Sequence, residues 1–184
     1  MGGVRGGKLN FEAPLGANLT PNPNFTGGKL SPYEGGTRVP CFLRGKGHLP
    51  EGVDSSALTA HFDMYPTFCD LAGIPADKQK ATDGISLLPI LNGADDKKFQ
   101  DRMLFIHSAR WPSGVSPDGY QYRNSAVRTP RFRLVNNTEL YDIPNDPSEK
   151  RNVIDQFPEE VERMRKAYDQ WWAEVRPKMI NDKP

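Results

Sequence analysis

The clearest pattern along the chain is a seam of apolar side chains between residues 157 and 175. They recur every three or four positions, at Phe157, Val161, Met164, Tyr168, Trp171 and Val175. Such spacing places them on one face of an α-helix. Pro158 suits the first helical position, and the two glutamates that follow it suit the positive end of the helix dipole. The pattern therefore predicts an amphipathic helix whose apolar face packs on the strands before it.

Short apolar runs before this helix predict those strands. One run is MLFIHS at residues 103–108, and another is NNTELYDI, which begins with an Asn-Asn turn. Between them, SAVRTPRFRLV at residues 125–135 is typical of either a strand pair or one strand broken at Pro130. Consecutive strands joined by short turns form antiparallel sheets. We therefore expect a meander of about three antiparallel strands.

The first hundred residues give weaker patterns. Alternation in RVPCFLRG, residues 38–45, predicts a short buried strand. Residues 55–75 have helical periodicity, with Asp63 as a candidate cap and Gly73 as the C-terminal stop. Residues 1–40 are rich in Gly, Pro and Asn and carry few apolar side chains. Such a stretch is functional, disordered or part of something larger, and we favour the last interpretation.

Composition and charge narrow the classes of function. The chain has 184 residues, of which 36% are hydrophobic and 26% charged, as in an ordinary globular domain. A net charge of +1 gives no basic field that would attract nucleic acid. The sequence contains no run of 18 apolar residues, so it predicts no membrane span. Cys41 and Cys69 form no C-x-x-C pair, so we expect two small buried side chains and no zinc site.

The segment GGKLSPYEGGTRVP, residues 27–40, combines four glycines with one lysine, Lys29. Glycine-rich turns expose backbone N–H groups that can surround an anion, and a nearby lysine adds a full positive charge. The segment therefore suits binding of phosphate, sulfate or carboxylate. A glycine-rich surface turn with a solvated lysine explains the pattern as well. Glu34 and Arg38 are four residues apart, and we expect them to pair with each other or with the loop backbone.

At these residues the sequence resembles a known family. KLSPYEGGTRVP, which starts at Lys29, is similar to the K-x-x-x-Y-E-G-G-x-R-x-P segment of the arylsulfatases. Further segments resemble motifs of the same family in the same order: HFDMYPTFCDLAGIP, TDGISLLPILNG, SAVRTPRFRLV and ELYDIPNDPSEKRNV. The five motifs cover about residues 27–155, and their order is far more specific than any one of them.

The resemblance implies the C-terminal part of an α/β, alkaline-phosphatase-like sulfatase fold. Residues 1–98 would be the C-terminal end of an incomplete catalytic domain. Residues 99–184 would form a subdomain, a small antiparallel sheet packed by a C-terminal helix. The implied activity is hydrolysis of sulfate monoesters, with a sulfated small molecule or glycan as substrate and a periplasmic or secreted location.

The resemblance also implies a site that is shared with a missing N-terminal catalytic portion. In this family a cysteine in a C-x-P-S-R context becomes formylglycine, and Asp and Asn side chains hold calcium. Neither Cys41 nor Cys69 has that context, and the Asp-Asp and D-N-G ligands have no match. Calcium and formylglycine are therefore expected in the full-length enzyme, and no metal on residues of this chain. The family's sulfate-binding lysine maps onto Lys29, which is the predicted catalytic residue.

Substrate contacts beyond sulfate are predicted at His107, Arg110 and Trp111, which begin a long loop. Trp111 would stack on a sugar or aromatic ring, while packing of His107 and Trp111 within the sheet is the alternative. Two other functions stay open. One is a fragment of a related phosphatase or phosphodiesterase, and the other is a non-catalytic sheet-and-helix binding module. The isolated chain is expected to be inactive as a sulfatase.

Overall fold

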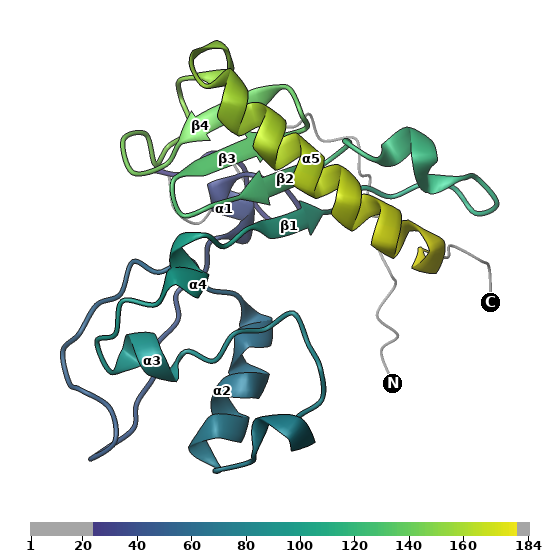
Figure 1. Cartoon of the computed structure of the whole chain (residues 1–184). Coiled ribbons are helices and arrows are strands. Elements are labelled where there is room, and N and C mark those ends of the chain that lie inside the picture. The colour runs from purple at the N-terminus through teal and green to yellow at the C-terminus, as the bar shows by residue number, and fades with distance from the viewer. Residues whose placement is uncertain (1–23, 180–184) are drawn as a thin grey trace, which may run out of the picture.

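The computed structural model describes residues 24–179 (Figure 1). A four-stranded sheet with a long helix across it forms one part, and short helices joined by loops form the other. The strands are β1 (Leu104–His107), β2 (Ser125–Arg128), β3 (Phe132–Val135) and β4 (Glu139–Asp142). The α-helices are α1 (Glu34–Thr37), α2 (Met64–Leu71), α3 (Leu88–Leu91), α4 (Lys97–Gln100) and α5 (Pro158–Val175). Short 3-10 helices are η1 (His61–Asp63), η2 (Ala76–Lys78), η3 (Pro117–Tyr120), η4 (Ile154–Gln156) and η5 (Arg176–Lys178).

The sheet is a meander in which every neighbouring pair of strands is antiparallel, in the order β1-β2-β3-β4. Residues 125–135 form a strand pair, which settles the open choice over this segment. The turn after β3 contains Asn136 and Asn137 with φ of 49° and 62°. Asn tolerates this left-handed conformation better than most residues. The predicted meander is confirmed, with four strands in place of about three because residues 125–135 form two of them.

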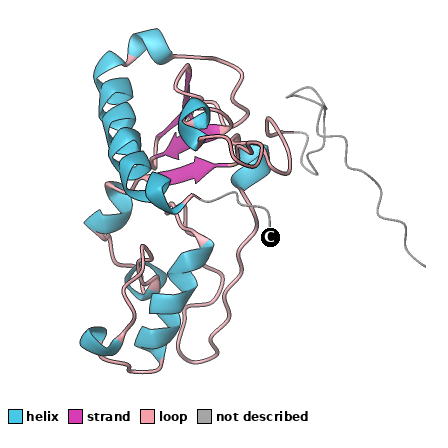
Figure 2. Ribbon diagram, turned by 90° about the vertical axis from the view of Figure 1, so that its right-hand side faces the viewer, coloured by secondary structure: helices cyan, strands magenta, loops and turns pink. Residues whose placement is uncertain are grey.

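Helix α5 covers one face of the sheet (Figures 1 and 2). Its buried side chains Val161, Met164, Tyr168 and Trp172 pack on side chains of the strands and of the segment after β4, which are Val127, Phe132, Leu134, Leu140 and Val153. The predicted helix is therefore confirmed. Trp172 is the buried tryptophan, whereas Trp171 is half-buried and stacks on Phe105 with a centroid separation of 5.3 Å.

Residues 38–45 do not form the predicted buried strand. The segment has no regular secondary structure, and Val39 and Phe42 are 76% and 92% exposed. A strand needs a neighbour for its backbone N–H and C=O groups, and none of the four strands among residues 24–179 pairs with this segment. The expectation of two buried cysteines is confirmed for Cys69 and wrong for Cys41, which is exposed.

The helix predicted within residues 55–75 is shorter than its pattern, because α2 has eight residues. Gly73 ends it as expected, with φ of 67°. The N–H groups of Gly73 and Ile74 donate to the carbonyls of Asp70 and Cys69, 3.0 and 2.9 Å away. This paired arrangement is the Schellman motif, which favours glycine at the left-handed position.

Asp63 stands at the N-cap position of α2, but its side chain makes no capping hydrogen bond to that helix and instead ties three segments together. Its carboxylate accepts two hydrogen bonds from Arg102, both at 2.7 Å. It also accepts from the backbone N–H groups of Ala60 and Ile85, at 2.6 and 3.0 Å. Burial alone would raise the pKa of Asp63, but these hydrogen bonds outweigh burial and hold the pKa below its usual value. The result is a buried, fully paired charge in a part of the chain with little regular structure.

Replacing Asp63 with Asn removes this charge and keeps the side chain's size. We expect the Asp63→Asn variant to lose about 3–5 kcal/mol in free energy of unfolding, because the Arg102 guanidinium stays buried without a counter-charge. Urea unfolding at pH 7 measures the loss. Because the folded-state pKa is lowered, the stabilisation by Asp63 is present above about pH 4 and disappears as the pH falls through the lowered value. Asp77→Asn, at an exposed position, is the control, and equal losses in both variants would contradict this role.

Candidate functional site

The turn that carries Lys29 lies on the face of the sheet opposite α5. Figure 1 shows α1, at the end of this turn, behind the strands, while α5 crosses in front of them. Tyr33 packs there against an apolar cluster formed by Ala126, Val135, Tyr141 and Ile143. The two faces of the sheet therefore hold different segments, one from each end of the described chain.

Lys29 occupies the apex of a tight turn. The N–H of Ser31 donates to the carbonyl of Gly28 at 2.9 Å, which leaves Lys29 and Leu30 as the two central residues. Leu30 has φ of 72°, the positive value that a type II turn requires at this position. Lys29 itself is exposed. The turn thus holds the lysine backbone in one geometry and presents its side chain at the surface.

The two glycines after Glu34 are required by close backbone contacts. A Cβ at Gly35 would lie 2.5 Å from the carbonyl oxygen of Gly27, and one at Gly36 would lie 2.3 Å from that of Ser31. Both contacts are far shorter than real Cβ atoms allow. The N–H of Gly35 uses this proximity to donate to the Thr26 carbonyl at 2.8 Å. Glycine at these positions therefore lets α1 pack directly against the Lys29 turn.

Glu34 attaches this packed unit to the sheet. Its carboxylate lies 2.6 Å from a guanidinium nitrogen of Arg133 and 3.0 Å from Nε of Arg128. Arg38 is 3.5 Å away, so the expected pair is present, but Arg38 is 56% exposed and the other three side chains are largely buried. Burial alone would raise the pKa of Glu34, but Arg133 and Arg128 hold it below its usual value.

Further hydrogen bonds fix the same turn. The Arg133 guanidinium also donates to the Pro32 carbonyl and, at 3.0 Å, to the hydroxyl of Thr37. The Tyr33 hydroxyl donates to Glu139 at 2.7 Å, and the Thr26 hydroxyl donates to the Ser148 carbonyl at 2.6 Å. The turn is therefore held on both sides of Lys29.

The other predicted site residues lie at the end of β1 and in the loop after it. His107 Nε2 is 2.9 Å from the carbonyl oxygen of Tyr120, and its ring lies 5.0 Å from that of Trp172. Trp111 is tilted against His107 at 6.4 Å, and Arg110 is exposed. The structure thus brings His107 and Trp111 together. No hydrogen bond or ion pair within residues 24–179 joins either of them to Lys29.

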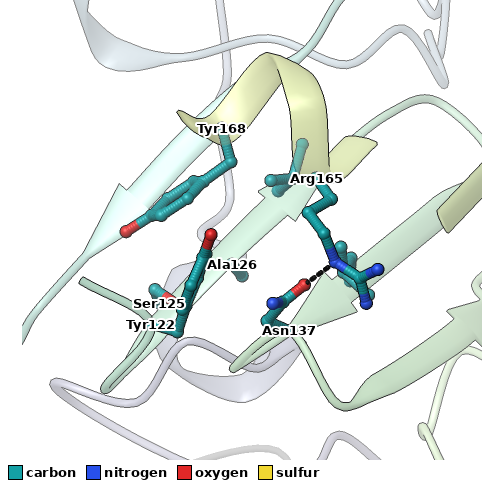
Figure 3. A pocket seen from close by; sticks show the side chains of 8 residues that line it. Tyr122, Ser125, Ala126, Asn137, Arg165 and Tyr168 are labelled. Atoms are coloured by element: carbon teal, nitrogen blue, oxygen red, sulfur yellow. Dashed lines mark hydrogen bonds between the residues drawn. The ribbon is translucent and has the colours of Figure 1, made fainter. Parts of the chain in front are cut away.

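A small hollow lies between α5 and the sheet and has no room for a substrate (Figure 3). Tyr122, Asn137, Arg165 and Tyr168 are among its lining residues, and Arg165 donates to Asn137 at 2.7 Å. Its volume of about 10 Å³ is room for one water molecule at most. A sulfate ester does not fit in this hollow.

Sequence reasoning missed Arg128 and Arg133 as anchors of the turn, although the motif that contains them was recognised. The available signal was their position, since the register pairs Arg128 with Arg133 and Arg133 with Tyr141 on one face of the sheet. From the sequence alone, this face is predicted to face solvent, because arginine is usually exposed. The face is buried only because the Lys29 turn packs on it.

Comparison with known proteins identifies the family. Residues 28–176 match the family described as N-sulphoglucosamine sulphohydrolase, C-terminal. The chain belongs to the sulfatase family. This confirms the resemblance drawn from the motifs, and it favours a sulfatase portion over a phosphatase fragment or a binding module. The observed sheet and C-terminal helix match the subdomain expected for the C-terminal part of this fold.

Individual sulfatases align with only part of their length. The chain is 34% identical over 134 residues to the delta 4,5-hexuronate-2-O-sulfatase of Bacteroides thetaiotaomicron, covering 67% of this chain and 26% of that protein. It is 31% identical over 148 residues to arylsulfatase K of Gallus gallus, covering 75% of this chain and 26% of that protein. The solved structure of a 2-O GAG sulfatase is 29% identical, covering 66% of this chain and 27% of its own, with a TM-score of 0.41. This chain therefore spans about a quarter of the length of these sulfatases.

Removal of the Glu34 carboxylate should detach the turn from the sheet. We expect Glu34→Ala to lower the free energy of unfolding by about 3–5 kcal/mol, because two buried guanidinium groups lose their shared partner. Chemical denaturation at pH 7 measures this change. Arg38→Ala removes the exposed arginine of the same cluster and should cost less than about 1 kcal/mol. A small effect of Glu34→Ala, similar to that of Arg38→Ala, would show that the buried pairs do not hold the turn.

Proposed function

We propose that this chain supplies the Lys29 side of the active site of a sulfatase that hydrolyses sulfate monoesters. The observation that supports this proposal best is an exposed lysine on a turn fixed by buried charges. Negative charge on the sulfate oxygens and on the leaving oxygen must be stabilised as the S–O bond breaks. A preorganised cation does so without rearranging during the reaction, and lysine provides a compact point charge for one oxygen.

Calcium and formylglycine would complete such a site, but the described residues do not fit either group. Within residues 24–179, no cluster of three or more His, Cys, Asp or Glu side chains is placed to hold a metal ion. Cys41 and Cys69 both lack the C-x-P-S-R context of the formylglycine precursor. We therefore assign both groups to the N-terminal catalytic portion of the full-length enzyme, and the role of this chain is limited to Lys29 and the substrate contacts.

Exposed apolar side chains in the first half of the described chain support the proposal that this part packs against another portion of the enzyme. They are Leu30, Val39, Phe42, Leu43, Val53, Tyr65, Phe68, Leu71 and Ile74. Exposed apolar surface of this extent often marks an interaction site. We propose that residues 1–98 are the C-terminal end of the catalytic domain, that this exposed apolar surface packs against the rest of that domain, and that residues 99–184 form the smaller subdomain.

The substrate in this proposal is a sulfated small molecule or glycan, and the location is periplasmic or secreted. Among the helices described between residues 24 and 179, none has the length and apolar character needed to cross a membrane. His107, Arg110 and Trp111 remain the proposed contacts beyond sulfate. The ring contact between His107 and Trp111 supports a shared surface, while the bond from His107 to the Tyr120 carbonyl gives that ring a structural role as well.

The central test is the contribution of Lys29 to turnover in the complete enzyme. We expect Lys29→Ala to lower kcat for an aryl sulfate by about 100- to 1,000-fold, because one preorganised positive charge is lost. Lys46→Ala, at another exposed lysine in the same half of the chain, is the matched control. The isolated 184-residue chain should release no product. Turnover by the isolated chain, or an unchanged kcat in Lys29→Ala, would overturn the proposed role.

The substrate contacts are tested by a different kinetic constant. Trp111→Ala removes a ring that would stack on the substrate, and a stacking contact of this type binds ground state and transition state alike. We therefore expect KM to rise by about 5- to 10-fold with little change in kcat. Steady-state kinetics with a sulfated sugar give both constants, and thermal unfolding checks the fold. An unchanged KM would leave Trp111 with a packing role only.

A further inference from the structure

One buried carboxyl group beneath the Lys29 turn has no part in the chemistry proposed above. It belongs to Glu149, between β4 and η4, whose side chain is fully buried. We propose that Glu149 is a positioning residue for Lys29, which keeps the turn on the sheet through the backbone N–H of Glu34 and the guanidinium of Arg133. The catalytic consequence rests on the function proposed for Lys29, whereas the attachment itself does not.

The contacts of this region reach both sides of the turn. Glu149 Oε2 accepts a hydrogen bond from the backbone N–H of Glu34 at 2.9 Å, in a buried position. This N–H lies at the start of α1, where a helical N–H has no acceptor within its own helix. The carbonyl of the preceding residue, Ser148, accepts from the hydroxyl of Thr26. The segment at residues 148–149 therefore binds the chain before and after Lys29.

Glu149 is itself held in an uncommon conformation. Its φ is 53°, in the left-handed region that is unfavourable for a residue other than glycine. Such a conformation persists only where the surroundings fix it. Here the Asp146 carboxylate accepts the N–H groups of Lys150 and Arg151 at 2.7 and 2.8 Å, and the Asp146 carbonyl accepts the N–H of Glu149 at 3.0 Å. The backbone thus places the carboxyl group firmly under the turn.

The charge partners of Glu149 are incomplete. Its Oε1 lies 3.3 Å from Arg133 Nε, yet neither atom has a hydrogen-bond partner within the described part of the chain. The other groups that face it are the Glu34 carboxylate, Arg128 and the hydroxyls of Tyr33 and Tyr141. Burial raises the pKa of Glu149 to about 7, although Arg133 and the Glu34 N–H oppose this rise.

Proton linkage gives the direction of the pH effect. The packed turn binds the Glu149 proton more tightly than an opened turn, in which water would restore an ordinary pKa of about 4.3. The stabilisation that comes from this proton is therefore complete below about pH 4.3 and is lost as the pH rises towards about 7. Above that pH the buried charge favours release of the turn.

Amide hydrogen exchange in the 184-residue chain tests the attachment directly. The reporter is the Gly35 N–H, which donates to Thr26 across the turn, and the reference is the set of α5 amides. Glu149→Ala should lower Gly35 protection at least tenfold while α5 protection changes less than twofold. Wild-type protection, corrected for intrinsic rates, should fall at least threefold between pH 6 and pH 8.5. Glu149→Gln should show no such fall, because it cannot ionise, and Glu162→Gln on exposed α5 surface should match the wild type.

Each other result contradicts the proposal. Unchanged Gly35 protection in Glu149→Ala would show that the carboxyl group does not hold the turn. Equal loss of protection in α5 would show a general loss of stability in place of a local role. A wild-type pH dependence in Glu149→Gln would show that another group titrates.

Kinetics of the complete enzyme then separate this role from the proposed function. We expect Glu149→Ala to lower kcat by about 10- to 100-fold through displacement of Lys29, and Glu149→Gln to retain activity with a flatter profile as the pH rises towards about 7. If the wild-type enzyme cleaves no sulfate ester, the proposed function fails, while the exchange data still decide the attachment. If Lys29→Ala is inactive but Glu149→Ala keeps full kcat, the positioning role fails and the proposed function stands.

Discussion

The arrangement of this protein depends on one buried carboxylate, Glu34, held between Arg128 and Arg133. Each of these charges would be costly in the interior alone, and together they satisfy one another. The carboxylate comes from the Lys29 turn, and the two arginines come from neighbouring strands. The pairing therefore requires the turn to lie on the sheet in one register, because a displacement of a few ångströms would leave a buried charge without a partner.

This constraint explains why the two faces of the sheet differ in chemistry. The face under α5 packs mainly through apolar side chains, whose contacts are largely non-directional. The face under the turn combines a small apolar cluster with charges and hydroxyl groups that must meet at defined distances. The role proposed for Lys29 requires a defined position, and the directional face is the one that carries this lysine.

The sequence predicted the elements whose signals are local. The seam of α5 and the stop at Gly73 follow from spacing or from a single turn residue, whereas the pattern of residues 125–135 predicted strand without deciding between a pair and one broken strand. The prediction of a strand at residues 38–45 failed because alternation along one segment does not show whether a partner strand exists. The proposed role of Lys29 came from a motif. The contacts that hold its turn could not be predicted from that motif, because the burial of Arg133 depends on a segment 99 residues away in the chain. Long-range charge pairing has no periodicity that a single sequence can reveal.

The separation between Glu34 and its anchors also has a consequence for biosynthesis. The turn leaves the ribosome about a hundred residues before β3, and at 5–20 residues per second this corresponds to a delay of roughly 5–20 s. Strands β2, β3 and β4 are joined by short connections, so they can pair soon after they emerge. Throughout that delay the nascent turn has an unpaired glutamate and close-packing glycines without a surface to pack on. The lysine is therefore among the first parts of this chain to be made and among the last to reach its final place.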